Sequence, residues 1–331
     1  METRKVQLTG GSTYTVSLPK GWATANDIGA GSEVAFHIED DSLLLAPVRE
    51  EERTRGVLDV SDLEGDRLTR AVMTMYVSGF DIISLEGSRI TSEQRRAIRE
   101  ATQSLVGVEV LEETSGRVVI QDLLDSSELS VHNAVSRMRL IATSMLEDAV
   151  RALVDHDADL ARDVIDRDDD VDRLYFVVSR IFRATLRSPQ AAAQLGLDRE
   201  ACFDYHACAR QLERIADHAA KISHLSRNLA EVPPAVAEAL EELHADVAEV
   251  IDRAMDAMFE TDSTESTTLA NAARDSILAI DDHARSIDEL LWDLEPQQAQ
   301  SLGLVVDSLS RSADYGGNIA ETALQNAAPN P

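Results

Sequence analysis

Two pairs of acidic residues are the part of this sequence best suited to chemistry. Asp168 and Asp172 are four residues apart, and so are Glu213 and Asp217. Residues four apart on a helix lie on the same face, so each pair could offer carboxylate oxygens to a hard cation. Ligation by oxygen alone favours Mg, Mn or Fe over Zn. Metal binding by these four side chains is therefore one hypothesis.

An ordinary charged surface is the alternative reading of the same pairs. The chain has 60 Asp and Glu among 331 residues, so many such spacings arise by chance. Glu213 and Asp217 point about 150° away from the apolar stripe of their helix, which predicts a site on the outside of a bundle. Arg210 and Arg214 are close enough to pair with both carboxylates, so simple salt bridges remain an open alternative.

A repeated phrase indicates how these helices are organised. The segment 212–218 reads LERIADH, and 309–315 reads LSRSADY. Aligning them also matches Asp217 with Asp314. Each helix must bury an apolar stripe against its neighbours, so a duplicated helix predicts a duplicated bundle.

The helical region divides at Pro189, Pro233 and Pro296 and at the polar turn near residue 262. Six helices are predicted, at Ser130 to His156, Asp159 to Arg187, Asp198 to Glu231, Pro234 to Glu260, Ser263 to Leu294 and Gln297 to Gln325. They give a mainly α chain with two tandem three-helix bundles, at residues 130–231 and 233–327. Gly316 and Gly317 inside the last helix predict a close approach to another helix.

Two smaller domains are predicted ahead of the bundles. Residues 1–48 alternate apolar and polar residues as strands do, and a β module this short cannot bury much surface alone, so we expect a homodimer. Residues 49–127 alternate strand and helix patterns, which predicts a small α/β domain. This domain contains no glycine-rich phosphate loop, so a linking or scaffolding role is favoured.

The composition narrows the class of protein. The net charge is -29, and Lys5, Lys20 and Lys221 are the only lysines, a composition resembling that of proteins from a salt-loaded cytoplasm. Such a charge repels nucleic acid except at a local basic patch. Cys202 and Cys208 are expected to be reduced, buried thiols. No apolar run is long enough to cross a bilayer, so we expect a cytoplasmic chain without membrane insertion.

The acidic motifs resemble those of one known family. The segments DRDDDVDRL, at 166–174, and RQLERIADH, at 210–218, look like those of the PhoU family of phosphate-uptake regulators. The resemblance covers Ser130 to Ala327 and implies two three-helix repeats that bind multinuclear metal clusters on the bundle surface. It also implies that Asp168, Asp172, Glu213 and Asp217 are metal ligands.

The second repeat departs from this pattern. Aligning Asp288 with Asp172 puts Ala284 in the place of Asp168, and Ser310 replaces Glu213. Asp288 and Asp314 then remain as a weaker second site, and Asp281 and Asp282 could compensate from a neighbouring turn.

The first domain resembles a different family. The segment SLPKGW at 17–22, followed by Ile28, Gly29 and Gly31, is similar to the AbrB-type swapped-hairpin module of transcription regulators. The resemblance implies DNA contacts by Arg4, Lys5 and Lys20. Residues 1–48 nevertheless hold three basic and six acidic residues, a net charge of -3. Dimerisation alone and DNA binding are both left open.

The resemblances together imply a non-enzymatic regulator of phosphate homeostasis. Its partners would be the ATPase of a phosphate ABC transporter, a sensor histidine kinase, or both, and promoter DNA if transcription is the route. A helical-bundle metalloenzyme is a further alternative, but a di-iron bundle needs two Glu-x-x-His helices and only 241–244 has that form. A structural adaptor without metal is the last alternative.

Overall fold

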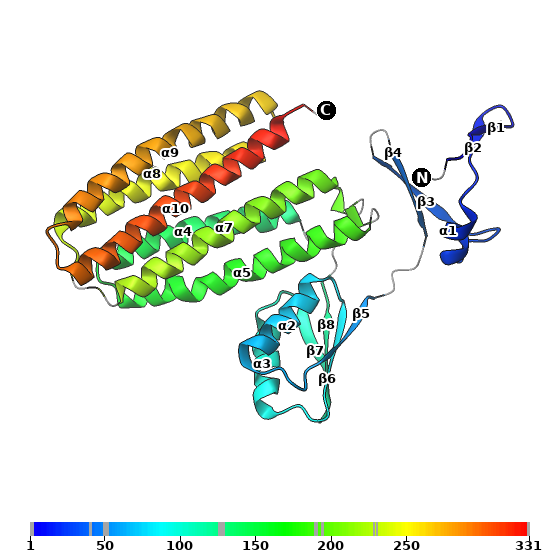
Figure 1. The fold of residues 1–331 in the computed structure, drawn as a ribbon, viewed down its shortest axis with the longest axis horizontal. Helices are drawn as coiled ribbons and strands as arrows, with labels where there is room; N and C mark the ends of the chain where they lie inside the picture. The colour runs from blue at the N-terminus through cyan, green and yellow to red at the C-terminus, as the bar shows by residue number, and fades with distance from the viewer. Residues whose placement is uncertain are drawn as a thin grey trace. The chain divides into compact units, whose positions relative to one another are not determined.

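The computed structural model describes residues 3–39, 42–48, 53–124, 130–188, 191–192, 195–227, 229 and 231–329. The chain divides into two compact units, Met1–Arg53 and Thr54–Pro331. The second unit contains the α/β domain and all the long helices (Figure 1).

The first unit consists of two hairpins and a short helix. Its elements are β1 (Gln7–Thr9), β2 (Thr13–Thr15), α1 (Lys20–Ala25), β3 (Val34–Glu39) and β4 (Ser42–Pro47). β1 pairs antiparallel with β2, and β3 with β4. Gly10 and Gly11 join β1 to β2 with φ values of +62° and +80°, which glycine adopts without the strain that a Cβ would add.

No described residue of this first unit is buried. Its large apolar side chains stand open to water, with Phe36 61% exposed and Ile38 81% exposed on one face of β3. An isolated two-stranded hairpin is marginally stable, because it buries too little apolar surface to offset the entropy of ordering. The unit therefore has the strands expected from the sequence but no interior of its own.

The α/β domain of the second unit has the alternating order expected from the sequence. Its elements are β5 (Arg55–Asp59), α2 (Gly65–Val77), β6 (Ile82–Glu86), α3 (Ser92–Gln103), β7 (Val108–Glu113) and β8 (Arg117–Asp122). The sheet has the order β5-β6-β8-β7, with β5 parallel to β6 and the other pairs antiparallel. Leu68 and Ile98 of the two helices pack with Leu85 and Ile120 of the sheet in one core.

Six long helices follow, as the sequence predicts. They are α4 (Val131–Val154), α5 (Ala158–Arg187), α7 (Arg199–Ser226), α8 (Pro234–Phe259), α9 (Ser263–Leu291) and α10 (Pro296–Ala327). Side chains cap four of the starts, at Ser130, Asp157, Asp198 and Asp262, by accepting hydrogen bonds from backbone N–H groups of the first turn. α8 and α10 begin at a proline, where the missing N–H costs nothing.

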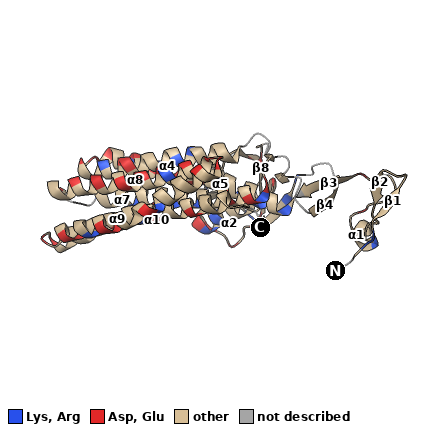
Figure 2. Ribbon diagram, turned by 90° about the horizontal axis from the view of Figure 1, so that it is seen from above, with Lys and Arg blue, Asp and Glu red and all other residues tan. Residues whose placement is uncertain are grey.

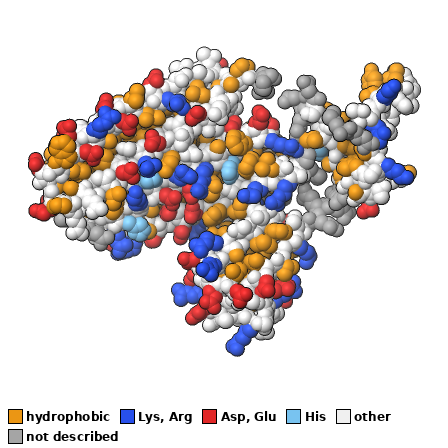
Figure 3. Space-filling model, viewed as in Figure 1, with side chains coloured by type: hydrophobic (Ala, Val, Ile, Leu, Met, Phe, Trp, Pro, Cys, Tyr) orange, Lys and Arg blue, Asp and Glu red, His pale blue; other side chains and the backbone are white. Residues whose placement is uncertain are grey.

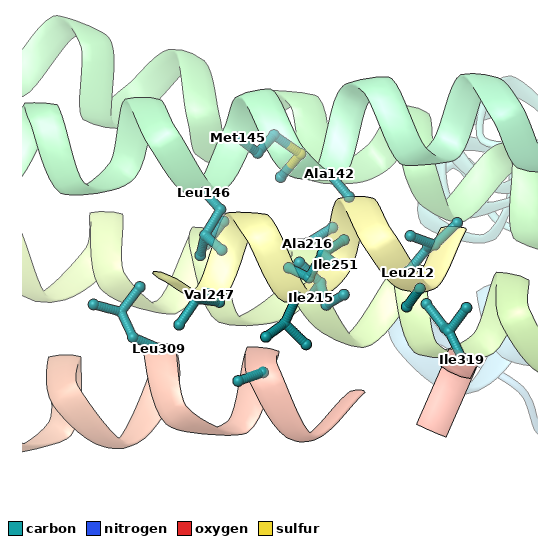
Figure 4. Packing of buried hydrophobic residues seen from close by; sticks show 14 of the residues in the cluster. Ala142, Met145, Leu146, Leu212, Ile215, Ala216, Val247, Ile251, Leu309 and Ile319 are labelled. Atoms are coloured by element: carbon teal, nitrogen blue, oxygen red, sulfur yellow. The ribbon is translucent and has the colours of Figure 1, made fainter. Parts of the chain in front are cut away.

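The two three-helix bundles share one hydrophobic core. α4, α5 and α7 form the first bundle and α8, α9 and α10 the second, with α7 lying along α10 and α4 touching α8. A single cluster of buried side chains runs through all six helices. Figure 4 shows part of it, with Met145 and Leu146 of α4, Leu212 and Ile215 of α7, Val247 and Ile251 of α8, and Leu309 and Ile319 of α10.

The two glycines of α10 mark where neighbouring helices come close. A Cβ on Gly316 would lie 3.1 Å from Val250 Cγ1 and 3.4 Å from the backbone of Ile251 on α8. A Cβ on Gly317 would lie 2.5 Å from Ile277 Cδ1 on α9. The prediction of a close helix approach is confirmed.

Candidate metal centre on the first bundle

The structure brings the two predicted carboxylate pairs together. Asp168 and Asp172 lie on α5, Glu213 and Asp217 lie on α7, and these two helices pack along each other. Burial raises the pKa of Asp168 to about 7, and the negative charges of Asp217 and Asp172 add to the shift. Burial likewise raises the pKa of Asp172 to about 7, with further contributions from Glu213 and Asp217. The α5 carboxylates therefore face those of α7.

Partial burial distinguishes this cluster from an ordinary acidic surface. Asp217 is exposed at the bundle surface, whereas the Glu213 side chain is only 13% exposed. Glu213 points away from the apolar stripe of α7, as the sequence predicts, and toward the neighbouring helix α5. Burial also raises the pKa of Glu213 and of Asp217, in each case as the largest cause. In both residues the nearby arginines Arg210 and Arg214 oppose the rise.

Among the residues that the structure describes, arginine directly contacts one of the four carboxylates, Glu213. Arg210 Nη1 donates to Glu213 Oε1 at 3.0 Å. The other oxygen, Glu213 Oε2, is buried and accepts no hydrogen bond from any residue that the structure describes. Arg214 stands over the ring of Tyr315, 5.5 Å from its centroid. The salt-bridge alternative therefore explains one oxygen of Glu213. The other oxygen is buried and negatively charged, and it still needs a hydrogen-bond donor or a cation.

The donor set fits a hard cation, although the ligands are not assembled around one point. Four carboxylates provide only oxygen, which suits Mg, Mn or Fe, and a cation would neutralise their mutual repulsion. Among the described residues, no three His, Cys, Asp or Glu side chains are arranged so that they could hold one metal ion. Metal ligation by these residues stays a prediction, and it requires rotation of the carboxylate side chains on α5 and α7.

The second repeat has a different register from the one inferred from sequence. Four buried residues of α5, namely Ala161, Val164, Val171 and Val178, recur 109 positions later on α9 as Ala270, Ala273, Ile280 and Ile287. This spacing matches Asp172 with Asp281 and Asp168 with Ile277. The alignment that matched Asp288 with Asp172 is therefore displaced by two helical turns.

Electrostatics in the second repeat agree with this corrected register. The pKa of Asp314 is raised by burial and then by the charges of Asp281 and Asp307, while Arg311 lowers it. Asp281 rather than Asp288 is thus the α9 residue that Asp314 senses. The signal that could have identified Asp281 was the spacing of small apolar residues on α9.

Histidines do not complete either cluster. The His218 ring packs against Tyr315 between α7 and α10, with centroids 5.7 Å apart. Burial there lowers the pKa of His218 to about 4. His206 stacks on Phe182 with ring centroids 4.6 Å apart. His244, in the Glu-x-x-His segment, has a pKa lowered by burial.

The basic residues predicted to contact DNA all lie in the first unit. Arg4 and Lys5 precede β1, Lys20 is the first residue of α1, and all three are exposed. Exposure is required for a DNA contact but is usual for lysine and arginine, so the DNA-binding role stays a prediction. None of the helices in the described part of the chain is long and apolar enough to span a membrane.

Comparisons with known proteins agree with the sequence resemblances. Residues 135–225 match the family model of the PhoU domain. Residues 7–53 match the family model described as antidote-toxin recognition MazE, a bacterial antitoxin. The PhoU match spans the three helices of the first bundle and all four clustered carboxylates. Both resemblances are confirmed, the second by a MazE-type match.

Two solved structures are similar in fold. PhoU from Pseudomonas aeruginosa is 22% identical with a TM-score of 0.52, over 60% of this chain and 96% of that one. The phosphate transport system regulatory protein PhoU from Streptococcus pneumoniae is 15% identical with a TM-score of 0.44, over 59% and 91%. Comparison with curated proteins gave no match. The first likeness confirms the fold class of two three-helix repeats.

Proposed function

We propose that this chain regulates phosphate uptake, acting through a protein contact that depends on metal bound to the first bundle. The observation that carries the proposal is the PhoU match over residues 135–225, which contains all four clustered carboxylates of α5 and α7. The proposal needs no catalytic step. The expected partner is the ATPase of a phosphate ABC transporter or a sensor histidine kinase, and the expected compartment is the cytoplasm.

The metal would supply positive charge where the chain has gathered negative charge. Asp168 and Asp172 would hold it from α5, and Glu213 and Asp217 from α7. The buried and unpartnered Oε2 of Glu213 supports this assignment, because such an oxygen is costly unless a cation or donor satisfies it. Asp281 and Asp314 are the corresponding candidates in the second repeat, with fewer carboxylates and therefore weaker affinity.

The first unit would dimerise the chain. Its lack of any buried described residue supports this role, because two copies could cover the apolar faces that one copy leaves open. The MazE match over residues 7–53 supports a second candidate function, transcriptional control, with Arg4, Lys5 and Lys20 on the DNA backbone. If transcription is the route, alanine at these three positions should abolish promoter binding. If it is not, the same change should leave control of phosphate uptake unchanged.

The test combines metal content with phosphate uptake in cells that lack the endogenous gene. Wild-type chain should lower uptake in phosphate-replete medium and should co-purify with Mg, Mn or Fe. The double variant Glu213→Ala with Asp217→Ala should lose both properties. Asp166→Ala is the matched control, because Asp166 is an exposed carboxylate on α5 within one turn of the cluster.

Two results would contradict the proposal. Equal metal content in the wild type and the double variant would remove the metal site. Unchanged phosphate uptake on loss and return of the wild-type gene would remove the regulatory role, whatever the metal content.

A further inference from the structure

A cationic and aromatic surface lies beside the carboxylate cluster on the same two helices. It consists of Tyr175, Phe182 and Arg183 of α5 with Phe203, His206 and Arg210 of α7. The His206 ring stacks on Phe182 at 4.6 Å and on Tyr175 at 5.8 Å between centroids. Phe182 also lies 6.0 Å from Phe203. We refer to these six residues as the aromatic–arginine surface.

Apolar side chains at this surface stand in water. Phe203 is 52% exposed, and Leu186, one turn beyond Phe182, is 57% exposed. Aromatic residues and arginine are the types most enriched where proteins bind other proteins, and exposed rings provide the apolar area that a partner can cover. Figure 3 shows hydrophobic and basic side chains side by side on the bundle face in view. The surface has the composition of an interface rather than of a solvated helix face.

The α5 part of this region has a charge opposite to that of the chain. Residues 173–187 contain four arginines and no acidic residue, in a chain of net charge -29. Figure 2 shows Asp and Glu spread along the long helices among Lys and Arg. Three of the four arginines are occupied, since Arg173 pairs with Asp170, and Arg180 and Arg187 bond to the α/β domain.

Arg183 is the fourth arginine, and it is available. Its side chain is exposed and makes no ion pair or hydrogen bond with any residue in the described ranges. The pKa of His206 is lowered first by burial and then by the positive charges of Arg183 and Arg210. Both guanidinium groups therefore lie near the stacked rings. Arg210 stands 5.3 Å from the centroid of Tyr175. Two cations, Arg183 and Arg210, therefore border a partly exposed aromatic strip, and Arg210 also pairs with Glu213.

We propose that the aromatic–arginine surface binds an acidic amphipathic helix of a partner protein. Apolar side chains of that helix, spaced three and four residues apart, would cover Phe203 and Phe182, and its Asp or Glu side chains would pair with Arg183 and Arg210. Nucleic acid is disfavoured, because the clustered carboxylates at the adjacent turns repel phosphate. The inference rests on the proposed function, since it identifies where and by what chemistry the regulatory partner is contacted.

A designed peptide tests the surface on the full chain without any phosphate readout. The probe is a fluorescent helix of about 18 residues with Leu on one face, Glu along both borders of that face and Ala elsewhere. Fluorescence anisotropy should show saturable binding. Arg183→Glu and Phe203→Ser should each raise the Kd at least about tenfold. Ser in place of Leu, or Gln in place of Glu, should weaken binding of the peptide to the wild type.

The matched control is Arg285→Glu, which makes the same charge change at an exposed arginine of α9. It should leave the Kd within about twofold, whereas a surface effect of overall charge alone would shift both variants equally. Circular dichroism of each variant checks that its helices are intact. Absence of binding, or equal binding to wild type and Arg183→Glu, would overturn the proposal.

Two further outcomes separate this inference from others. If Arg183→Glu reduces the oligomer size of the chain, the surface is covered by a second copy and the proposal is wrong. If the peptide binds as expected but the Glu213→Ala, Asp217→Ala variant still restrains phosphate uptake, the metal-dependent function fails while the docking surface stands.

Discussion

Arg180 of α5 lies 3.0 Å from Asp122 at the end of β8, measured from Nε to Oδ2, and joins the bundle to the α/β domain. The same guanidinium reaches Asp81 and the backbone carbonyls of Tyr76 and Phe80. Arg180 is 13% exposed and Asp122 7%. Burial raises the pKa of Asp122 even beside this arginine. Arg180 is thus one of the residues that hold the α/β domain on α5, together with Phe176 and Arg187, and its pair with Asp122 is nearly dry.

Replacing Arg180 should destabilise the chain strongly. Arg180→Met leaves Asp122 buried without its cation, and breaking such a pair costs about 3–5 kcal/mol. Urea unfolding of the full chain measures the change. Arg96→Met is the control, because its ion pair with Glu100 is exposed and contributes at most about 1 kcal/mol. Adding Asp122→Asn to Arg180→Met should restore part of the loss, and a failure to do so would show that the unpaired charge is not the cause.

Neutralising one clustered carboxylate should have opposite effects on stability and on metal affinity. Asp172→Asn removes a charge that Glu213 and Asp217 repel, so the metal-free variant should melt at a higher temperature than the metal-free wild type. The same change removes a proposed ligand, so stabilisation by added Mn²⁺ should be smaller. Scanning calorimetry with chelator and with Mn²⁺ gives both values. The control Asp166→Asn should change neither the metal-free Tm nor the stabilisation by Mn²⁺. A lower metal-free Tm for Asp172→Asn would refute the repulsion between the carboxylates.

The metal-free chain should lose stability as the pH rises toward neutrality. Asp168 and Asp172 have folded-state pKa values of about 7, above the ordinary 3.8, so the folded chain binds more protons than the unfolded chain between these values. The two protonated carboxyls contribute fully to the free energy of unfolding below about pH 4, and this contribution is lost as the pH rises through 7.

His218 acts in the opposite direction over an overlapping range, because its pKa is lowered to about 4. The measurement is therefore a comparison of wild type with Asp168→Asn, Asp172→Asn in chelator between pH 5 and 8. The variant should gain stability relative to the wild type as the pH rises. A constant difference across this range would contradict the raised pKa values.

The dimer should depend on the exposed face of β3. Phe36→Asp with Ile38→Asp places two charges where an apolar partner surface is expected, so the full chain should become monomeric in sedimentation experiments. Arg4→Ala with Lys5→Ala and Lys20→Ala should leave the dimer intact, since these residues are exposed and polar. A dimer that survives the β3 variant would move the contact to another surface.

Helix positions and the first carboxylate cluster could be predicted from the sequence, because both depend on local periodicity. Capping residues and prolines fix where helices begin, and four-residue spacing puts Asp168 and Asp172 on one face. The burial of Glu213 could not be predicted in this way. It depends on which neighbour lies beside α7, a property of packing between helices and not of one helix.

The second repeat shows the limit of matching charged motifs. Asp288 and Asp281 are both preceded by an isoleucine, so the local phrase around Asp172 fits either position. Only the spacing of the buried alanines Ala270 and Ala273 separates the two registers. Apolar spacing is the more dependable guide, because a shift of one turn there exposes the core, whereas a surface carboxylate can shift at little cost.

The first unit leaves its apolar strands in water, and this has a consequence for the whole protein. In the homodimer that we propose, a second copy shields those strands, so their ordering is bimolecular and its extent follows how many copies the cell makes. The number of gene copies would then set how much of the first unit is ordered, independently of anything that binds to the helices.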